Sequence, residues 1–301
     1  MTITRLSSIV EEARRRGRRR LAVAYANDEH TIRAVYNAWL ENLVSPTLFG
    51  DKEKILAICA AENIDSAVFD IVDEKSDVRC VERAVAMVAA GNADVLMKGL
   101  VSTDKYMRGI LNKDAGLFPP KGTLSHVSVV ELPGRDKLLC IADVAVIPLP
   151  DFKQKTVIIK YLAKIAASLG VDCPKIACIA PSEQVLTSVT SSTDGAILAK
   201  MGDRGQLGNV IVDGPLSLDV ALYPEVAVEK KVKGSAVAGE ADCLLFPNIE
   251  SGNVFFKSAT HLAGAEIAAI VVGTKVPCVL TSRGDTPLTK LYSIALACIQ
   301  I

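Results

Sequence analysis

The feature that most constrains the fold of this chain is a regular alternation of short apolar runs with amphipathic segments. Runs of strand length are followed by segments of helical periodicity, and this pattern repeats along most of the sequence. The strand-like runs cover residues 21–26, 47–50, 67–72, 94–99, 175–180, 210–215, 241–246 and 268–272. Strands separated by helices pair in parallel, and helices then cover both faces of the sheet. The pattern therefore predicts an α/β protein whose ligands bind where strands end.

The size and charge of the chain limit the kinds of partner that it is expected to bind. With 301 residues, of which 50% are hydrophobic, it is long enough for two domains. It has 34 basic and 34 acidic residues, so no net charge attracts nucleic acid or an anionic membrane. No apolar stretch reaches the roughly 18 residues that span a bilayer, and the N-terminus has no signal-peptide pattern. We therefore expect a cytoplasmic protein with small-molecule partners, no nucleic acid and no membrane.

The eight cysteines are scattered, mostly within apolar runs, and none forms a C-x-x-C pair. Core thiols in a reducing compartment explain this distribution better than disulfides or a zinc site. The cysteines therefore predict no metal site.

Arginines cluster around Gly17, at positions 14–16 and 18–20. We interpret them as the solvated end of a helix, where cations interact favourably with the helix dipole. A contact to nucleic acid or to a CoA phosphate is the alternative.

The order of the elements also predicts how the chain is divided. Residues 124–132 and 137–141 alternate like an antiparallel hairpin, and Asp143 with the proline-containing run after it indicates a change of direction. The final strand and helix, residues 276–298, are too short for a domain of their own. We therefore expect a first domain of residues 1–147 plus 276–301 and a second of residues 148–275.

Polar residues stand where several of these strands end. Lys98 and Gly99 close one strand, and the glycine leaves backbone N–H groups open to an anion. A polar loop at residues 248–253 is expected to lead into a helix over 254–262. Ser125 and His126 lie on the hairpin, where the histidine is either a base or a satisfied structural residue.

The stretch after the last strand is the richest in chemistry. Ser282, Arg283 and Asp285 follow the apolar run 276–280 and precede a helical pattern. A hydroxyl, a guanidinium and a carboxylate side by side suit a reaction in which negative charge develops on an oxygen. No G-x-G-x-x-G follows the first strand, and P-loop, G-x-S-x-G and H-E-x-x-H motifs are absent from the sequence. The sequence therefore gives no specific support to four function classes: dinucleotide-binding proteins, nucleotide triphosphatases, serine hydrolases and metalloenzymes.

Five stretches together resemble one family, the phosphate acyltransferases. They are DVLMKGL at 94–100, LSHV at 124–127, VDGPLSL at 212–218, IESGNV at 249–254, and TSR at 281–283 with KLYSI at 290–294. The likeness covers nearly the whole chain and is greater to the phosphate butyryltransferase branch than to the phosphate acetyltransferase branch.

The resemblance implies a reversible transfer of a short-chain acyl group, butyryl first, between CoA and inorganic phosphate to give acyl phosphate. It also implies a two-domain fold like that of isocitrate and isopropylmalate dehydrogenases, with three-layer α/β/α domains, the active site in the interdomain cleft and a homodimer or higher homo-oligomer. CoA and phosphate are then substrates, and no cofactor is tightly bound.

The resemblance also assigns roles within the site. Ser282 is expected near the CoA thiol and Arg283 on the carbonyl oxygen. Phosphate needs hydroxyls, cations and backbone N–H groups, for which the candidates are Lys98, Gly99, Ser125, His126, Gly252 and Asn253.

One position departs from the acetyl-transferring branch. That branch has a catalytic aspartate seven residues after the serine, where this chain has Thr289. The butyryl-type motif Ser-Arg-Ala-Asp-Ser is nearly reproduced at 282–286, so Asp285 is the candidate base. The alternatives are a phosphate acetyltransferase, a dehydrogenase on the same fold that needs a metal held by aspartates, and a non-catalytic acyl-CoA sensor.

Overall fold

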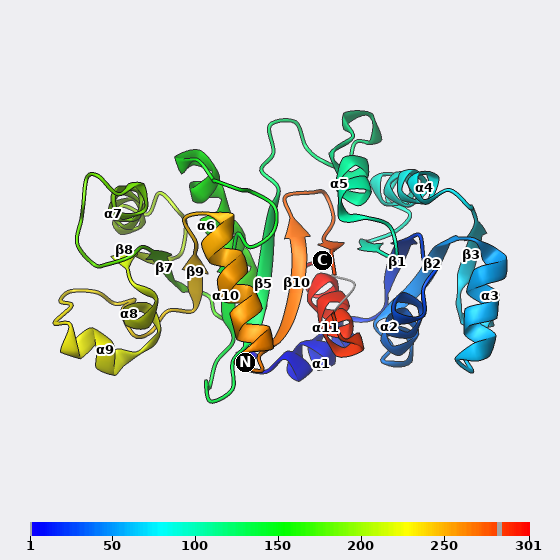
Figure 1. Ribbon diagram of the computed structural model, residues 1–301, viewed down its shortest axis with the longest axis horizontal. Helices are drawn as coiled ribbons and strands as arrows, with labels where there is room; N and C mark the ends of the chain where they lie inside the picture. The colour runs from blue at the N-terminus through cyan, green and yellow to red at the C-terminus, as the bar shows by residue number, and fades with distance from the viewer. Residues whose placement is uncertain (1, 282–284) are drawn as a thin grey trace. The chain divides into compact units, whose positions relative to one another are not determined.

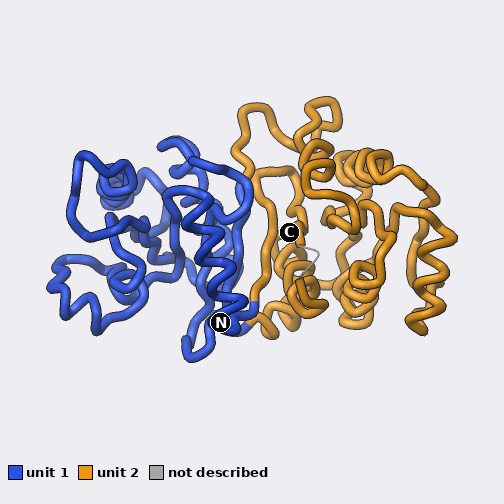
Figure 2. Tube along the Cα trace, viewed as in Figure 1, with its two compact units in different colours: residues 1–5, 125–266 blue, residues 6–124, 267–301 orange. Residues whose placement is uncertain are grey.

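The computed structural model describes residues 2–281 and 285–301, and the chain divides into two compact units (Figure 2). Unit 1 comprises Met1–Arg5 and Ser125–Glu266, and unit 2 comprises Leu6–Leu124 and Ile267–Ile301. The boundaries expected after residues 147 and 275 differ from this division. The reason is that the hairpin beginning at Ser125 pairs, through its second strand, with a strand at Cys243–Leu245, so the hairpin belongs to unit 1.

Unit 2 is built on a mostly parallel set of strands, as the alternating sequence pattern predicts (Figure 1). The strands lie in the order β3-β2-β1-β4-β11-β10, and β10 and β11 are the antiparallel pair. Their bounds are β1 Arg19–Ala24, β2 Val44–Gly50, β3 Asp70–Asp73, β4 Val95–Lys98, β10 Glu266–Val272 and β11 Cys278–Val279. Leu21 of β1 stands opposite Val95 of β4, and Val279 of β11 stands opposite Met97. This register brings the ends of β1, β4 and β11 to one edge of the sheet.

The helices of unit 2 begin at side chains that cap them. Asp28, Asp51, Ser76 and Ser102 each accept a hydrogen bond from a backbone N–H three residues later. A cap of this kind stabilises a helix by about 1 kcal/mol. The helices are α1 Leu6–Arg16, α2 Glu29–Leu40, α3 Lys52–Ala61, α4 Asp77–Ala89, α5 Thr103–Leu111 and α11 Pro287–Cys298, with 3₁₀ turns at Ser66–Val68 and Lys113–Ala115. Helix α11 packs against α1 and α2. The strand predicted at 67–72 is wrong in its first half, because the 3₁₀ turn occupies that part.

The arginine cluster at the end of α1 makes ion pairs within unit 2. Arg15 and Arg16 both contact the Glu12 carboxylate, at 2.8 and 2.7 Å, and their hydrogen bonds lower the pKa of Glu12 to about 2. Arg14 pairs with Glu41, and Arg20 lies 2.6 Å from Asp94. The interpretation as a helix end therefore holds for Arg14–Arg16, whereas Arg19 and Arg20 begin β1.

Unit 1 has its strands in the order β5-β6-β9-β7-β8. The predicted hairpin is confirmed, because β5 and β6 pair antiparallel with Val129 opposite Cys140, whereas the remaining neighbours are parallel. The strands are β5 Ser125–Glu131, β6 Leu139–Ala142, β7 Lys175–Ile179, β8 Ile211–Leu216 and β9 Cys243–Leu245, and the helices are α6 Phe152–Ser168, α7 Thr190–Asp203, α8 Leu218–Leu222, α9 Pro224–Glu229 and α10 Ile249–His261.

The polar stretch 248–253 is a helix start and not the expected loop. Helix α10 begins at Ile249, because Asn248 caps it by accepting from the Ser251 N–H at 2.9 Å. Gly252 therefore lies in the first turn of the helix, and Asn253 follows it directly. The prediction of a loop is wrong, because an asparagine cap favours a helix directly after it even where glycine and polar residues follow.

Seven of the eight cysteines are buried, and Cys173 is exposed. The prediction that the thiols lie mainly in the core is thus confirmed. Within residues 2–281 and 285–301, no helix combines the length and the apolar character needed to cross a membrane.

Candidate active site

Unit 2 contains a cavity of about 170 Å³ where its strands end. The N-terminal turn of α2, the end of β4, the segment after β11 and the first turn of α11 form its wall. The lining residues are Asp28, His30, Thr31, Lys98, Gly99, Leu100, Thr281 and Lys290. The edge of a parallel sheet where strands end is the usual ligand position in α/β proteins. Two of the predicted binding residues, Lys98 and Gly99, therefore line a cavity at that edge.

Lys98 is the last residue of β4 and is only 4% exposed. Its Nζ donates to the carbonyl oxygens of Gly99 and Val101, at 3.2 and 3.0 Å. These bonds hold the ammonium group at the turn that follows the strand.

Gly99 is required by the packing of the sheet. A Cβ at this position would lie 2.3 Å from the Tyr25 carbonyl oxygen, and the Gly99 N–H donates to the Ala24 oxygen at 2.9 Å. The glycine lets the turn after β4 approach the turn after β1, so the requirement for glycine has a structural cause of its own.

The C-terminal candidates are only partly described. Thr281 is buried after β11, whereas Ser282 and Arg283 lie outside the described residues. Asp285 is half-buried and directly precedes Thr286, the N-cap of α11. Thr289 donates its N–H to Thr286 Oγ1 at 3.1 Å, so this position takes part in the helix cap.

In unit 1, the other predicted binding residues lie around one buried aspartate. Asp143 is 1% exposed, and its Oδ2 accepts from Ser125 Oγ at 2.9 Å and from the His126 N–H at 3.2 Å. Its Oδ1 accepts from the N–H groups of Ala145 and Val146, both at 2.8 Å. Four donors thus satisfy this carboxylate, which is the condition for burying one at low cost.

Helix α10 completes this Asp143 cluster. A Cβ on Gly252 would lie 2.3 Å from the Asp143 carbonyl oxygen, and Asn253 Nδ2 donates to the Val144 oxygen at 3.0 Å. The structure therefore brings Ser125, His126, Gly252 and Asn253 together. Sequence reasoning used Asp143 only as the sign of a turn, and no sequence motif marks it as the centre of the cluster.

The His126 side chain is packed in the interior of unit 1. It is 3% exposed, and its ring meets that of Phe256 edge to face with centroids 6.5 Å apart. Nδ1 lies 3.4 Å from Ser128 Oγ, and the tautomer decides which of the two donates. These contacts fix the orientation of the imidazole ring.

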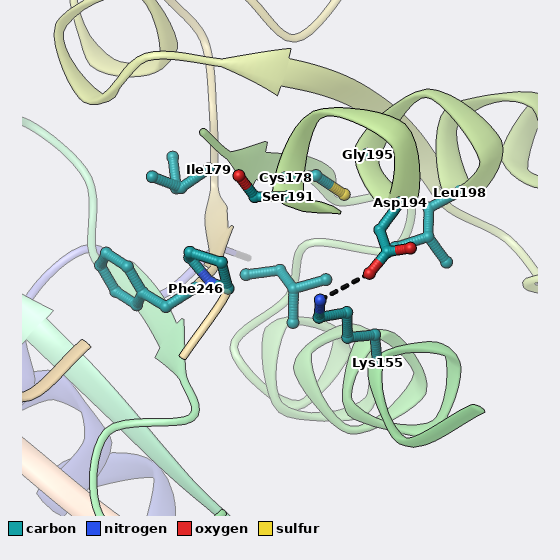
Figure 3. A pocket seen from close by; sticks show the side chains of 10 residues that line it. Lys155, Cys178, Ile179, Ser191, Asp194, Gly195, Leu198 and Phe246 are labelled. Atoms are coloured by element: carbon teal, nitrogen blue, oxygen red, sulfur yellow. Dashed lines mark hydrogen bonds and ion pairs between the residues drawn. The ribbon is translucent and has the colours of Figure 1, made fainter. Parts of the chain in front are cut away.

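A second pocket lies in unit 1 and surrounds an ion pair (Figure 3). Lys155 of α6 is 5% exposed, and its Nζ lies 2.6 Å from Asp194 Oδ2 of α7. The free space is about 10 Å³, close to what one water molecule needs. Burial raises the pKa of the neighbouring Cys178 thiol to about 12. The ion pair joins helices α6 and α7, and the pocket around it is too small for a substrate.

Comparison with known proteins identifies one family. Residues 79–298 match the family described as Phosphate acetyl/butaryl transferase. The chain is 43% identical to a phosphate butyryltransferase of Clostridium beijerinckii, over 93% of this chain and 92% of that protein. It is 39% identical to a phosphate acetyltransferase of Thermotoga maritima, over 98% of this chain and 99% of that protein.

Solved structures agree on the fold. A branched-chain phosphotransacylase from Enterococcus faecalis superimposes with a TM-score of 0.82 at 30% identity, over 93% of this chain and 98% of that one. A 4-hydroxythreonine-4-phosphate dehydrogenase from Klebsiella pneumoniae shares the fold alone, with a TM-score of 0.54 at 12% identity over 94% of this chain and 100% of that one. The predicted dehydrogenase-like α/β fold is therefore confirmed. The chain belongs to the phosphate acetyl and butyryl transferase family.

Proposed function

We propose that this chain transfers a short-chain acyl group reversibly between CoA and inorganic phosphate, with butyryl preferred. The observation that carries the proposal is the 43% identity to a phosphate butyryltransferase over 93% of the chain. CoA and phosphate are substrates in this reaction, and no tightly bound cofactor takes part. By analogy with its family, the protein is expected to work as a homodimer or a higher homo-oligomer.

The reaction is a direct substitution at the thioester carbon. A phosphate oxygen forms a bond to the carbonyl carbon, the carbonyl oxygen becomes negative in the tetrahedral intermediate, and the C–S bond then breaks. The CoA thiolate leaves and takes up the proton that hydrogen phosphate loses on becoming acyl phosphate. In the reverse direction a thiol with a pKa of about 8.5 must lose that proton, so a nearby carboxylate accelerates the step.

Three residues after β11 are proposed for this chemistry. Arg283 stabilises the oxyanion, since a guanidinium stays charged and offers several donors. Ser282 lies beside the thiol, and Asp285 is the proposed base. Asp285 is half-buried just before the N-cap of α11, three residues after Ser282 in the sequence, and this position supports its role beside the thiol.

Binding of the anionic substrates is proposed for the remaining predicted residues. Lys98 contributes a buried ammonium to the unit 2 cavity, and Gly99 contributes the close turn beside it. In unit 1, the contacts of Asp143 hold Ser125 and His126, and Asn253 is tied to the same turn. Their common attachment to one buried carboxylate supports a shared role in positioning a substrate.

A phosphate acetyltransferase is the second candidate, because the Thermotoga maritima relative is 39% identical over 98% of this chain. The two candidates differ in the volume available to the acyl chain. One methylene in an apolar pocket changes specificity by only about 1 to 3 kcal/mol. The preference for one acyl chain length over another must therefore be measured directly.

The test is release of free thiol from acetyl-, propionyl-, butyryl- and isobutyryl-CoA with phosphate present and absent. We expect phosphate-dependent release with the largest kcat/KM for butyryl-CoA. A largest value for acetyl-CoA would favour the acetyltransferase. Tight CoA binding with no release from any thioester would overturn the proposal in favour of an acyl-CoA sensor, and reduction of NAD by a hydroxy acid would favour a dehydrogenase.

A further inference from the structure

The side chains of His126 and Ser128 lie on the same face of β5. They are two residues apart, and side chains along a strand alternate between its two faces. His126 is 3% exposed and Ser128 is fully buried. The imidazole Nδ1 and the hydroxyl Oγ are 3.4 Å apart. The pair is therefore enclosed in unit 1, where its polar atoms depend on protein partners.

The position of the hydrogen in this contact follows from what the Ser128 hydroxyl can reach. Within the described part of the chain, His126 Nδ1 is its single hydrogen-bond partner. If Nδ1 carried a hydrogen, it would donate to Oγ, and the hydroxyl hydrogen would be buried without an acceptor, which is costly. If Nδ1 carries none, it accepts the hydroxyl hydrogen and both atoms are satisfied. The neutral imidazole therefore carries its hydrogen on Nε2.

The contacts of His126 also determine which of its atoms can act on a substrate. The main-chain N–H donates to Asp143 Oδ2 at 3.2 Å, and Nδ1 is engaged by Ser128. The ring of Phe256, on α10, meets the imidazole edge to face and fixes its plane. Nε2 is therefore the nitrogen through which this side chain can act. A base needs an unprotonated nitrogen, whereas Nε2 carries a hydrogen both in this neutral tautomer and in the imidazolium.

We propose that Ser128 is a positioning residue that keeps the hydrogen of His126 on Nε2, so that His126 donates a hydrogen bond to a substrate oxygen and is not the base of the reaction. This inference rests on the proposed function, whose substrates carry phosphate oxygens and a thioester carbonyl oxygen. Both kinds of oxygen accept hydrogen bonds. Of the two interpretations that the sequence left open for His126, base or structural residue, neither is then correct.

Nitrogen NMR of the full chain with isotopically labelled histidine tests the tautomer independently of activity. The chain has three histidines, so the His126 signals are identified by their loss in His126→Gln. At a pH of about 9, where an ordinary imidazole is neutral, we expect a protonated Nε2 and an unprotonated Nδ1 in the wild type. An unprotonated Nε2 would overturn the proposal, and this result needs no variant that has to fold.

Variants of Ser128 test whether its hydroxyl fixes the tautomer. Ser128→Ala should leave the two tautomers in exchange, with averaged nitrogen shifts, and should lower kcat/KM for thiol release about tenfold, the usual effect of one hydrogen bond. Ser128→Thr keeps the hydroxyl and should restore the wild-type shifts and most of the activity. Ser45→Ala, at an exposed serine of β2, is the control and should change neither. A fixed wild-type tautomer in Ser128→Ala would overturn the role of Ser128.

Two amide variants separate a donor from a base. Glutamine places an amide N–H group close to the position of Nε2, whereas the shorter asparagine places one close to Nδ1. His126→Gln should therefore keep kcat/KM within about tenfold of the wild type, and His126→Asn should lose about 10² or more, as for a lost donor to developing charge. Neither amide can replace a base. Equally large losses in both variants would therefore overturn the donor role, as would wild-type activity in both.

The kinetic constants of His126→Asn identify the acceptor oxygen. A raised KM for phosphate would assign the hydrogen bond to a phosphate oxygen, and a lowered kcat with unchanged KM values would assign it to the carbonyl oxygen as its charge develops. Either result supports the proposal. If the wild type releases no CoA from any thioester but Nε2 is protonated, the proposed function fails and the fixed tautomer stands. If CoA is released but Nε2 is unprotonated, this inference fails and the proposed function stands.

Discussion

The Ser125 hydroxyl donates a hydrogen bond of 2.9 Å to the Asp143 carboxylate, and both groups are buried. The same carboxylate accepts three backbone N–H groups, so it holds the start of β5 and the turn after β6 in one position. Asp143 can affect substrate binding without contacting the substrate, because it orients Ser125 and His126, which are proposed to bind it.

Asp143→Asn should lower the free energy of unfolding by about 3 kcal/mol, because an amide has one acceptor oxygen and leaves buried N–H donors unpaired. Ser125→Ala removes one donor and should cost about 1 kcal/mol. Urea unfolding of both variants measures the difference. Equal losses for the two variants would contradict the central role of the carboxylate.

Gly99→Ala should destabilise the protein more than Gly91→Ala. A Cβ on Gly99 would meet the Tyr25 carbonyl oxygen at 2.3 Å, whereas a Cβ on Gly91 would meet no atom within 4 Å. Gly91 has φ +76°, so its substitution carries a backbone cost of about 1 kcal/mol and serves as the matched control. Thermal and urea unfolding report the difference, and a smaller loss for Gly99→Ala would contradict the packing argument.

Arg283→Ala should lower kcat for phosphate-dependent CoA release by about 10² to 10³, the usual cost of losing an oxyanion donor. Arg204→Ala, at an exposed position of unit 1, is the control and should leave kcat unchanged. Retained activity in Arg283→Ala would contradict its assigned role.

Asp285→Asn tests the proposed base separately. If Asp285 takes the thiol proton, the variant should lose about 10² or more in the direction that starts from CoA and acyl phosphate. Thr289→Val is the matched control, because it removes the hydroxyl that lies 3.1 Å from Thr286 Oγ1 but keeps the backbone N–H bond to the same cap. Comparable losses in the two variants would indicate damage to the start of α11 instead of loss of a base.

Lys155→Met should destabilise the protein by about 3 kcal/mol, since it leaves the largely buried Asp194 without its ion-pair partner. The double variant Lys155→Met with Asp194→Leu should recover most of that loss, because apolar groups replace both charges. Urea unfolding measures each variant. Since this pair lies in the small pocket of Figure 3, thiol release should be unchanged, and a lost activity would contradict a purely structural role.

Glu12 gives a pH dependence of known sign. The hydrogen bonds from Arg15 and Arg16 lower the pKa of Glu12 from 4.5 to about 2 in the folded chain. A depressed carboxyl pKa contributes stability that is present above the unfolded value and is lost as the pH falls from 4.5 to about 2. The contribution should be about 1 kcal/mol or less, because the arginines are partly exposed to solvent. Unfolding of Glu12→Gln and wild type between these pH values should converge at the acid end.

Local sequence signals predicted many of the elements well. The alternation at residues 124–132 and 137–141 predicted a hairpin, and the structure pairs β5 with β6 antiparallel. At residues 248–253, glycine and polar neighbours suggested a loop, although the Asn248 cap begins α10 there. Predictions of this kind depend on groups a few residues apart, so they succeed when one local signal dominates. The interdomain position of the active site stays a prediction.

The sequence by itself determined the α/β class and the family, because strand and helix periodicity and short motifs are local properties of the chain. It did not indicate that Asp143 is the centre of a buried cluster or that Lys290 lines a cavity. Asn253 meets the turn at Val144 across 109 positions, and Asp28 shares a cavity with Lys290 from the other end of the chain. Only the tertiary structure determines such contacts between residues that are distant in the sequence. The order of the strands in the sheet decides which of these side chains are buried together.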